Sequence, residues 1–184
     1  MATRKAKQKK HSQVISVPSE KKPAGAHPRK KHPGGSLFPG SVLEHTVVFI
    51  LLVIATAVLY APALGLGFFR IDDQQYVVNN PWIQGFTADN LRYIFTTPYF
   101  VNFSPLHLLS YMIDFGFNGA DPYVFHLSSN IWAGIVAGLV YLTSLALTQK
   151  KMLSIAAAIL FVVHPAHVEA VAWISSRKDL VAAA

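Results

Sequence analysis

The sequence predicts an all-α membrane protein, a polytopic bundle of transmembrane helices, and three observations support this fold class. Hydrophobic residues make up 52% of the chain and charged residues only 14%, whereas about a quarter of a soluble domain is charged. Long stretches without Asp, Glu, Lys or Arg separate the charges, and such stretches can span a bilayer as helices. The chain has no cysteine, which excludes a disulfide framework and thiolate metal ligands.

The N-terminal segment, residues 1–40, differs sharply from the rest of the chain. Ten of the 16 Lys and Arg residues lie between Arg4 and Lys31, among Pro, Gly, Ser and His. This composition predicts a disordered basic tail, which the positive-inside rule assigns to the cytoplasm. We expect weak contact with anionic lipids. No aromatic residues are interleaved with the basic ones, so no nucleic acid partner is expected.

Two transmembrane helices are predicted at residues 45–66 and 125–147. Glu44 and Arg70 bracket 25 residues without a formal charge, and Asp121 and Lys150 bracket 28. Within the second stretch, Gly134 and Gly138 form a pair of small residues four positions apart. Such a pair permits a neighbouring helix to pack closely.

A third span is predicted at residues 152–168, and a fourth begins at about residue 178. The apolar part of the third, Met152–Val163, is short for a bilayer, so a thinned membrane or a re-entrant segment is the alternative. The fourth is incomplete at Ala184, so we expect further spans in a longer protein. The transmembrane domain would therefore be the region 41–184 together with later segments.

The charges also predict an orientation. The basic tail and Lys150-Lys151 flank spans on one side, which should be cytoplasmic. The loop at residues 67–124 and the segment from His164 to Asp179 are then extracytoplasmic. Within the loop, Thr87 is a candidate cap for a short helix, and Ser104-Pro105 should begin a second helix that carries Leu106, Leu109 and Ile113 as a stripe. We interpret both as amphipathic helices on the outer membrane surface.

Two acidic residues follow the first span directly, at Asp72 and Asp73. Paired carboxylates suit a general base or a divalent cation site, because each carboxylate raises the pKa of its neighbour. A polar turn at the exit from the membrane is the alternative, since Asp is favoured in turns.

A second polar cluster places His164, His167 and Glu169 directly after the third apolar stretch, with Arg177 and Lys178 further on. Ionisable residues at membrane depth usually mark a functional site. The His and Glu residues could hold a metal, although their spacing is not a standard zinc signature.

The same cluster could also bind an anion. Pro165 could begin a new helix with N–H groups free for an anion. A continuous helix would place Glu169, Trp173 and Arg177 on one face. Arg177 and Lys178 are natural phosphate ligands, and a salt bridge to Asp179 or Glu169 is the alternative.

These motifs together resemble a known family. The matching residues are Asp72-Asp73 with Tyr76 and Asn80-Pro81, then Phe103-Ser104-Pro105-Leu106. The longest match is His-Pro-x-His-x-Glu-x-Val-x-Trp-Ile-x-x-Arg-Lys-Asp-Leu, from His164 to Leu180. From Phe68 to Ala184 the chain resembles the membrane half of the TPR-repeat protein O-mannosyltransferase type of glycosyltransferase, bacterial relatives included, which has the GT-C fold.

The resemblance implies transfer of a sugar, with mannose a candidate, from a polyprenyl-phosphate donor to a protein hydroxyl or a glycan on the extracytoplasmic face. It implies Asp72 as general base, with Asp73 orienting it or holding a cation. Arg177 and Lys178 would bind the donor phosphate, and His164, His167 and Glu169 would organise the pocket or hold a metal. The sequence does not itself require a divalent cation.

The family's later spans and C-terminal TPR repeats are expected but absent from this chain, so the chain alone should be inactive. A bacterial inner membrane is the expected location, and the endoplasmic reticulum membrane is the alternative. Two other functions stay open from the residues: a non-catalytic scaffold for a TPR domain, and a transporter segment with a His/Glu relay.

Overall fold

A computed structural model describes residues 38–184, and these residues form helices without a β-strand. The predicted tail at residues 1–40 lies outside the described residues except for its last three positions. The helices are α1 (Val42–Leu59), α2 (Ala88–Thr96), α3 (Pro105–Asn118), α4 (Pro122–Thr148), α5 (Lys151–Val163), α6 (His167–Ala172) and α7 (Arg177–Ala183). Short helical turns are η1 (Ala61–Gly65), η2 (Gln74–Val78), η3 (Pro81–Ile83) and η4 (Ile174–Ser176).

Helices α1 and α4 are both long and apolar enough to cross a membrane. Only 17% of α1 is buried, and its exposed side chains include Ile50, Leu51 and Ile54, which is unlike the core helix of a soluble protein. The helix is shorter than the predicted span at residues 45–66. It ends at Leu59, and Pro62 lies in the 3-10 turn η1 that follows, because proline cannot continue the α-helical hydrogen-bond pattern.

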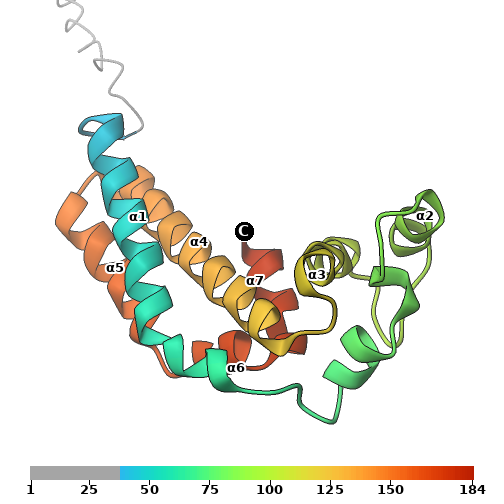
Figure 1. Ribbon diagram of the computed structural model, residues 1–184. Helices are drawn as coiled ribbons and strands as arrows, with labels where there is room; N and C mark the ends of the chain where they lie inside the picture. The colour runs from blue at the N-terminus through green and yellow to red at the C-terminus, as the bar shows by residue number, and fades with distance from the viewer. Residues whose placement is uncertain (1–37) are drawn as a thin grey trace, which may run out of the picture. The chain divides into compact units, whose positions relative to one another are not determined.

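Helices α1 and α4 pack side by side (Figure 1), and the glycine pair makes this possible. A Cβ atom on Gly134 would lie 2.8 Å from the Cα of Val53, and one on Gly138 would lie 2.2 Å from a ring carbon of Phe49. Both distances are below van der Waals contact, so a larger residue would displace the α1 backbone at Gly134 or the Phe49 ring at Gly138. The predicted small-residue contact is therefore present, with α1 as its partner.

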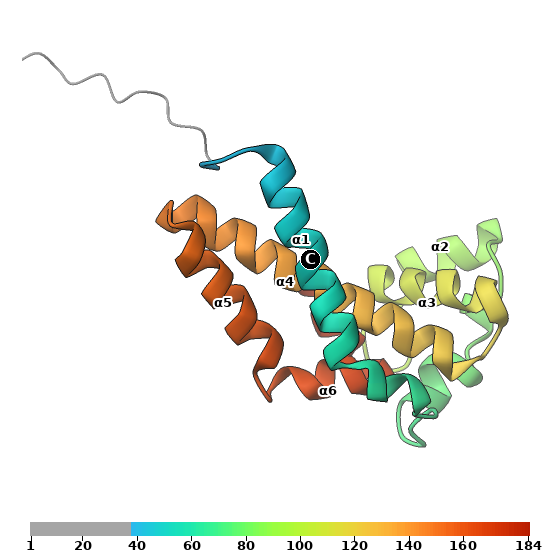
Figure 2. The same cartoon turned by 60° about the vertical axis from the view of Figure 1, so that its left-hand side comes forward.

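Helix α5 turns back along α4 after Gln149, which adopts a left-handed conformation with φ 57°. At this end of the bundle Lys151 forms an ion pair with Glu44 at 3.3 Å. The third predicted span, residues 152–168, is not one helix. α5 ends at Val163, extended backbone follows at His164, and α6 begins at His167 after Pro165; Figure 2 shows the bend.

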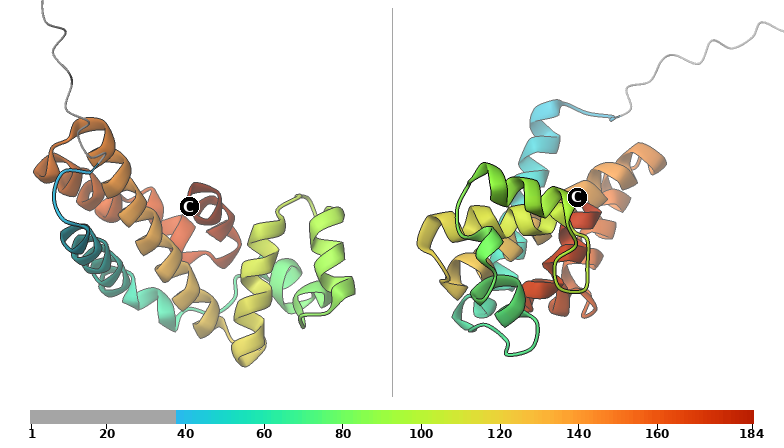
Figure 3. Two further views of the ribbon diagram at one scale, coloured as in Figure 1. Left: turned by 90° about the horizontal axis from the view of Figure 1, so that it is seen from above. Right: turned by 90° about the vertical axis from the view of Figure 1, so that its right-hand side faces the viewer.

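The loop between α1 and α4 folds into the two predicted helices, and Figure 3 shows α2 and α3 at the end of α4 that is distant from α5. Thr87 caps α2 as expected, since its hydroxyl accepts a hydrogen bond from the Asn90 amide at 3.1 Å. Ser104 occupies the N-cap of α3, but its hydroxyl forms no capping bond. The predicted stripe of α3 is not its core face, because Leu106 and Ile113 are exposed.

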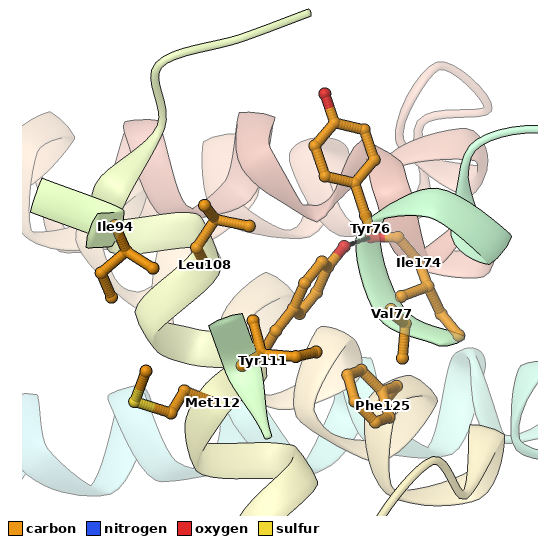
Figure 4. Close-up of a cluster of buried hydrophobic side chains, with 9 residues drawn as sticks. Tyr76, Val77, Ile94, Leu108, Tyr111, Met112, Phe125 and Ile174 are labelled. Carbon is orange, nitrogen blue, oxygen red and sulfur yellow. Dashed lines mark hydrogen bonds between the residues drawn. The ribbon is translucent and has the colours of Figure 1, made fainter. Parts of the chain in front are cut away.

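The buried face of α3 instead forms a core with the first loop and the segment after α6. Nine buried side chains make up this core: Tyr76, Val77, Ile83, Ile94, Leu108, Tyr111, Met112, Phe125 and Ile174. Figure 4 shows Tyr111 directed toward Ile174, whose carbonyl accepts a 2.5 Å hydrogen bond from the Tyr111 hydroxyl. The core therefore fixes the positions of the polar residues in the first loop and in the segment after α6.

Candidate functional site

Asp73 is completely buried and joins the two polar clusters. Its Oδ1 accepts hydrogen bonds from the backbone amide of Ser175 at 2.9 Å and from the Ser175 hydroxyl at 2.5 Å. Its Oδ2 accepts one from the Phe69 amide at 2.9 Å. Three neutral donors thus compensate the buried carboxylate, as burial of a charge requires. Asp73 and Ser175 are 102 positions apart, and their contact joins the acidic pair to the segment that carries the second cluster.

Asp72 lies beside this junction but is only half-buried. Its backbone carbonyl accepts from the amides of Gln75 and Tyr76, which starts the turn η2. Its carboxylate has no hydrogen-bond partner in the part of the chain that the structure describes. Of the two acidic residues, Asp72 is therefore the one whose carboxylate is not engaged by another described residue.

Arg177 is also completely buried, and protein groups occupy its guanidinium. It pairs with Asp114 of α3, donates to the Phe125 carbonyl, and donates to the Ser129 hydroxyl at 3.0 Å. The guanidinium carbon lies 4.7 Å from the centroid of the Tyr111 ring, a cation–π distance. Burial raises the pKa of Asp114 above its ordinary value, although the charge of Arg177 opposes this shift.

Arg177 and Lys178 were both expected to bind phosphate, but their environments differ. In this structure Arg177 connects α7 to α3 and α4, and its ion-pair partner is Asp114, not Asp179 or Glu169. Lys178 and Asp179 are exposed. The continuous face expected for Glu169, Trp173 and Arg177 is absent, because the helix is interrupted at Trp173, where the backbone is extended.

His164 and Glu169 are exposed, and His167 is half-buried against Phe161, with ring centroids 4.0 Å apart. Burial and the neighbouring charge of His164 lower the pKa of His167. No group of three His, Asp or Glu side chains within residues 38–184 is placed to hold a metal ion. The predicted metal site is therefore not assembled in this part of the chain.

The anion site predicted after Pro165 is also not formed. The amides of Ala166, His167 and Val168 already bond to the His164 ring, the His164 carbonyl and the Pro165 carbonyl. A helix of only six residues follows. The N–H groups that were expected to be free are therefore used within the turn.

An apolar groove of about 290 Å³ lies beside the Asp72 turn. Phe69 and Ile71 line one side, and Val168, Ala172 and Trp173 line the other, with Glu169 among them. A neighbouring groove shares Val168 and Ala172 and extends to Leu59 and Val163 at the ends of α1 and α5. An apolar surface thus leads from the bundle to Glu169 and to Ile71, which directly precedes Asp72.

Two residues of this site were missed in the sequence: Ser175 and Asp114. Ser175 carries no signal of its own, because a serine within an apolar motif is ordinary. Asp114 did carry one, since it is the only charged residue between Arg92 and Asp121. A solitary charge on a helix with a buried face should have a cationic partner.

Fold and site together define a helical protein with two helices able to cross a membrane and a buried polar junction between its first loop and its C-terminal segment. No protein-family model and no solved structure matches the chain. The chain is similar to the protein O-mannosyl-transferases Tmtc1 and Tmtc2 of Drosophila melanogaster, with 34% and 33% identity over 67% and 68% of the chain. It is 32% identical to TMTC1 of Mus musculus over 72% of its length.

These relatives are much longer than the chain. The matched region is 15%, 14% and 15% of their respective lengths. The similarity supports the resemblance to the O-mannosyltransferase family that the motifs of the sequence indicate.

Proposed function

We propose that this chain is part of a membrane protein O-mannosyltransferase of the GT-C type. It moves mannose from a polyprenyl-phosphate donor to a hydroxyl of an acceptor protein on the extracytoplasmic face. Similarity to the animal O-mannosyl-transferases over two thirds of the chain supports the reaction. Because the match covers only 14–15% of these relatives, the proposal concerns the full-length protein.

One observation carries the proposal: the Asp73–Ser175 junction joins the acidic pair of the first loop to the segment that ends in Arg177-Lys178. A sugar transfer from a phosphate needs a base for the acceptor hydroxyl and a cation for the departing phosphate. The junction supports the presence of the base and the phosphate-binding cation in one compartment. It also favours an enzyme over a transporter, because the polar residues gather at the end of the helical bundle.

The residues then take distinct roles. Asp72, with its unpartnered carboxylate, is the general base that accepts the proton of the acceptor hydroxyl. Asp73 orients the turn that carries Asp72. Lys178 contributes the accessible positive charge for the donor phosphate, while Arg177 holds the segment in place through Asp114 and could reach phosphate only by leaving that pair. His164, His167 and Glu169 form the rim of the pocket.

The orientation follows from the ion pair at the opposite end of the bundle. Glu44 and Lys151 lie together, which supports a common cytoplasmic side for the first residues of α1 and for the α4–α5 turn. The Asp73 junction would then face the other side. The animal origin of the relatives favours the endoplasmic reticulum membrane over a bacterial inner membrane.

The test is a transfer assay with the full-length protein in lipid nanodiscs. Radiolabelled mannose on a polyprenyl phosphate serves as donor, and a peptide rich in serine and threonine serves as acceptor. We expect label in the peptide, and none when a nucleotide sugar replaces the lipid donor. A folded protein that transfers nothing from the lipid donor would contradict the proposal and favour a non-catalytic scaffold for a TPR domain.

A further inference from the structure

The N-terminus of α3 has no protein group to cap it. Ser104 holds the N-cap position, yet its hydroxyl oxygen is buried and has no hydrogen-bond partner among residues 38–184. Pro105 has no N–H, and the first hydrogen bond of the helix runs from the Leu108 amide to the Ser104 carbonyl. The amides of Leu106 and His107 are therefore without an acceptor, at the positive end of a 14-residue helix.

A buried side chain beside this helix end also lacks a partner. His107 is 2% exposed, and neither ring nitrogen has a hydrogen-bond partner within the described region. Its ring lies between Tyr111 and Tyr76, with centroid distances of 4.3 and 5.8 Å. Side chains on a helix point back toward its N-terminus, and His107 lies on the first turn of α3, three positions after Ser104. Buried polar atoms nearly always have a partner, so the His107 ring is free to bond to a group that binds at this helix end.

Positive charge adjoins the same helix end. Helix α7 packs on α3, and Arg177 donates to the Ser110 hydroxyl on the next turn. The exposed Lys178 follows directly. Burial, Arg177 and Lys178 together lower the pKa of His107 to about 3, so its ring is neutral near pH 7 and keeps one N–H to donate.

The nearby acidic groups are already compensated. Asp114 is paired with Arg177, and Asp73 accepts from the three donors at the junction. Lys178 forms no ion pair with an acidic residue within the described region. Asp72 and Asp179 also have carboxylates without a partner among the described residues, so the free positive charge at this helix end is that of Lys178 and of the helix dipole.

We propose that the N-terminus of α3, with Ser104, His107 and Lys178, binds a phosphate group. Free helix amides, a hydroxyl, an imidazole N–H and an ammonium form the donor set that phosphate oxygens require. Building on the proposed function, this phosphate is the headgroup of the lipid-linked donor. Phe103 and Leu106, both exposed beside the site, would contact the first carbons of its chain.

Two probes separate a lipid headgroup from free phosphate. The full-length protein in nanodiscs is titrated with farnesyl phosphate or with inorganic phosphate, and binding is followed by ³¹P NMR. We expect Lys178→Gln to weaken farnesyl phosphate binding about tenfold or more, the size of one charge-assisted hydrogen bond. Lys150→Gln, a matched change at the α4–α5 turn, should leave binding unchanged. Inorganic phosphate that binds with the same dependence on Lys178 would show a site for phosphate alone and would overturn the lipid assignment.

Ser104→Asp separates a phosphate site from a merely structural role. Aspartate is a good N-cap, so this variant should melt at a higher temperature than the wild type, while its negative charge should abolish phosphate binding. Ser104→Ala gives the neutral comparison. Farnesyl phosphate affinity within twofold of wild type in Ser104→Asp, or in both Lys178→Gln and Ser104→Ala, would overturn the inference.

These outcomes are distinct from those of the transferase test. Mannose transfer with normal donor KM in Ser104→Asp would remove this site and leave the proposed function intact. Farnesyl phosphate binding that depends on Ser104 and Lys178 in a protein without transferase activity would keep the site and remove the function.

Discussion

Asp73 and Ser175 are bonded twice, once through the Ser175 amide and once through its hydroxyl, although 102 positions separate them. Next to Ser175, the Ile174 carbonyl accepts from Tyr111, and Arg177 pairs with Asp114. The segment Ile174–Arg177 is therefore attached at three points to the α1–α4 loop. Any change in its position must alter the turn that carries Asp72.

The Asp73–Ser175 contact should contribute measurably to stability. Ser175→Ala removes the 2.5 Å hydroxyl bond and should lower the free energy of unfolding by about 1–3 kcal/mol, because the buried carboxylate loses a donor. Asp73→Asn should lower the free energy of unfolding further, because the NH2 group of the asparagine amide would face N–H donors. Thermal melting in detergent measures both. Ser176→Ala is the control, and an equal loss in that variant would contradict the assignment.

The Arg177–Asp114 pair should show the asymmetry of a buried ion pair. Asp114→Asn or Arg177→Ala alone should destabilise the protein by about 3–5 kcal/mol, because the remaining charge stays buried without its partner. The double replacement Arg177→Met with Asp114→Leu should recover much of this loss. If the decreases in melting temperature of the two single variants simply add in the double variant, the two residues do not interact.

The contact between α1 and α4 should depend on its two glycines to different extents. Gly134→Ala meets the backbone of Val53, which cannot move without displacing α1, whereas Gly138→Ala meets the ring of Phe49. We expect a loss of about 1–3 kcal/mol for Gly134→Ala. Phe49→Ala should restore packing in the Gly138→Ala variant but not in Gly134→Ala. Unfolding in denaturant would detect this, and rescue of both variants would contradict the geometry.

Much of the fold could be predicted from the sequence, because apolar stretches and capping residues are local signals. Thr87 begins a helix as expected, and the Gly134–Gly138 pair makes the helix contact that its spacing indicates. Element ends were less predictable. The span expected at residues 45–66 stops at Leu59, and that at residues 152–168 breaks at His164, since Pro62 and Pro165 interrupt the hydrogen-bond pattern.

The site was harder to predict, because its contacts join residues far apart in the chain. Motif chemistry identified Asp73 and Arg177, yet periodicity could not show that Ser175 and Asp114 satisfy them. An arginine next to a lysine suggested two equivalent phosphate ligands. The structure buries the first and exposes the second, a difference that depends on the packing of α3 against α7.

His107 should make stability sensitive to acid. Its folded-state pKa of about 3 lies below the ordinary 6.5, so between these pH values the unfolded state binds a proton that the folded state does not. Stability should therefore fall as the pH decreases from 6.5 toward 3. His107→Phe should reduce this slope, as melting temperatures across the pH range can measure. Parallel pH curves for variant and wild type would contradict the buried neutral state.

The central claim is that Asp72 accepts the proton of the acceptor hydroxyl, and Asp72→Asn in the full-length protein tests it most directly. Asparagine keeps the size and removes proton acceptance, a role worth about 10²–10⁴-fold in rate. We predict that mannose transfer from the polyprenyl-phosphate donor falls by that factor, with an unchanged melting temperature and unchanged farnesyl phosphate binding. Transfer within twofold of wild type in the Asp72→Asn variant would contradict the account.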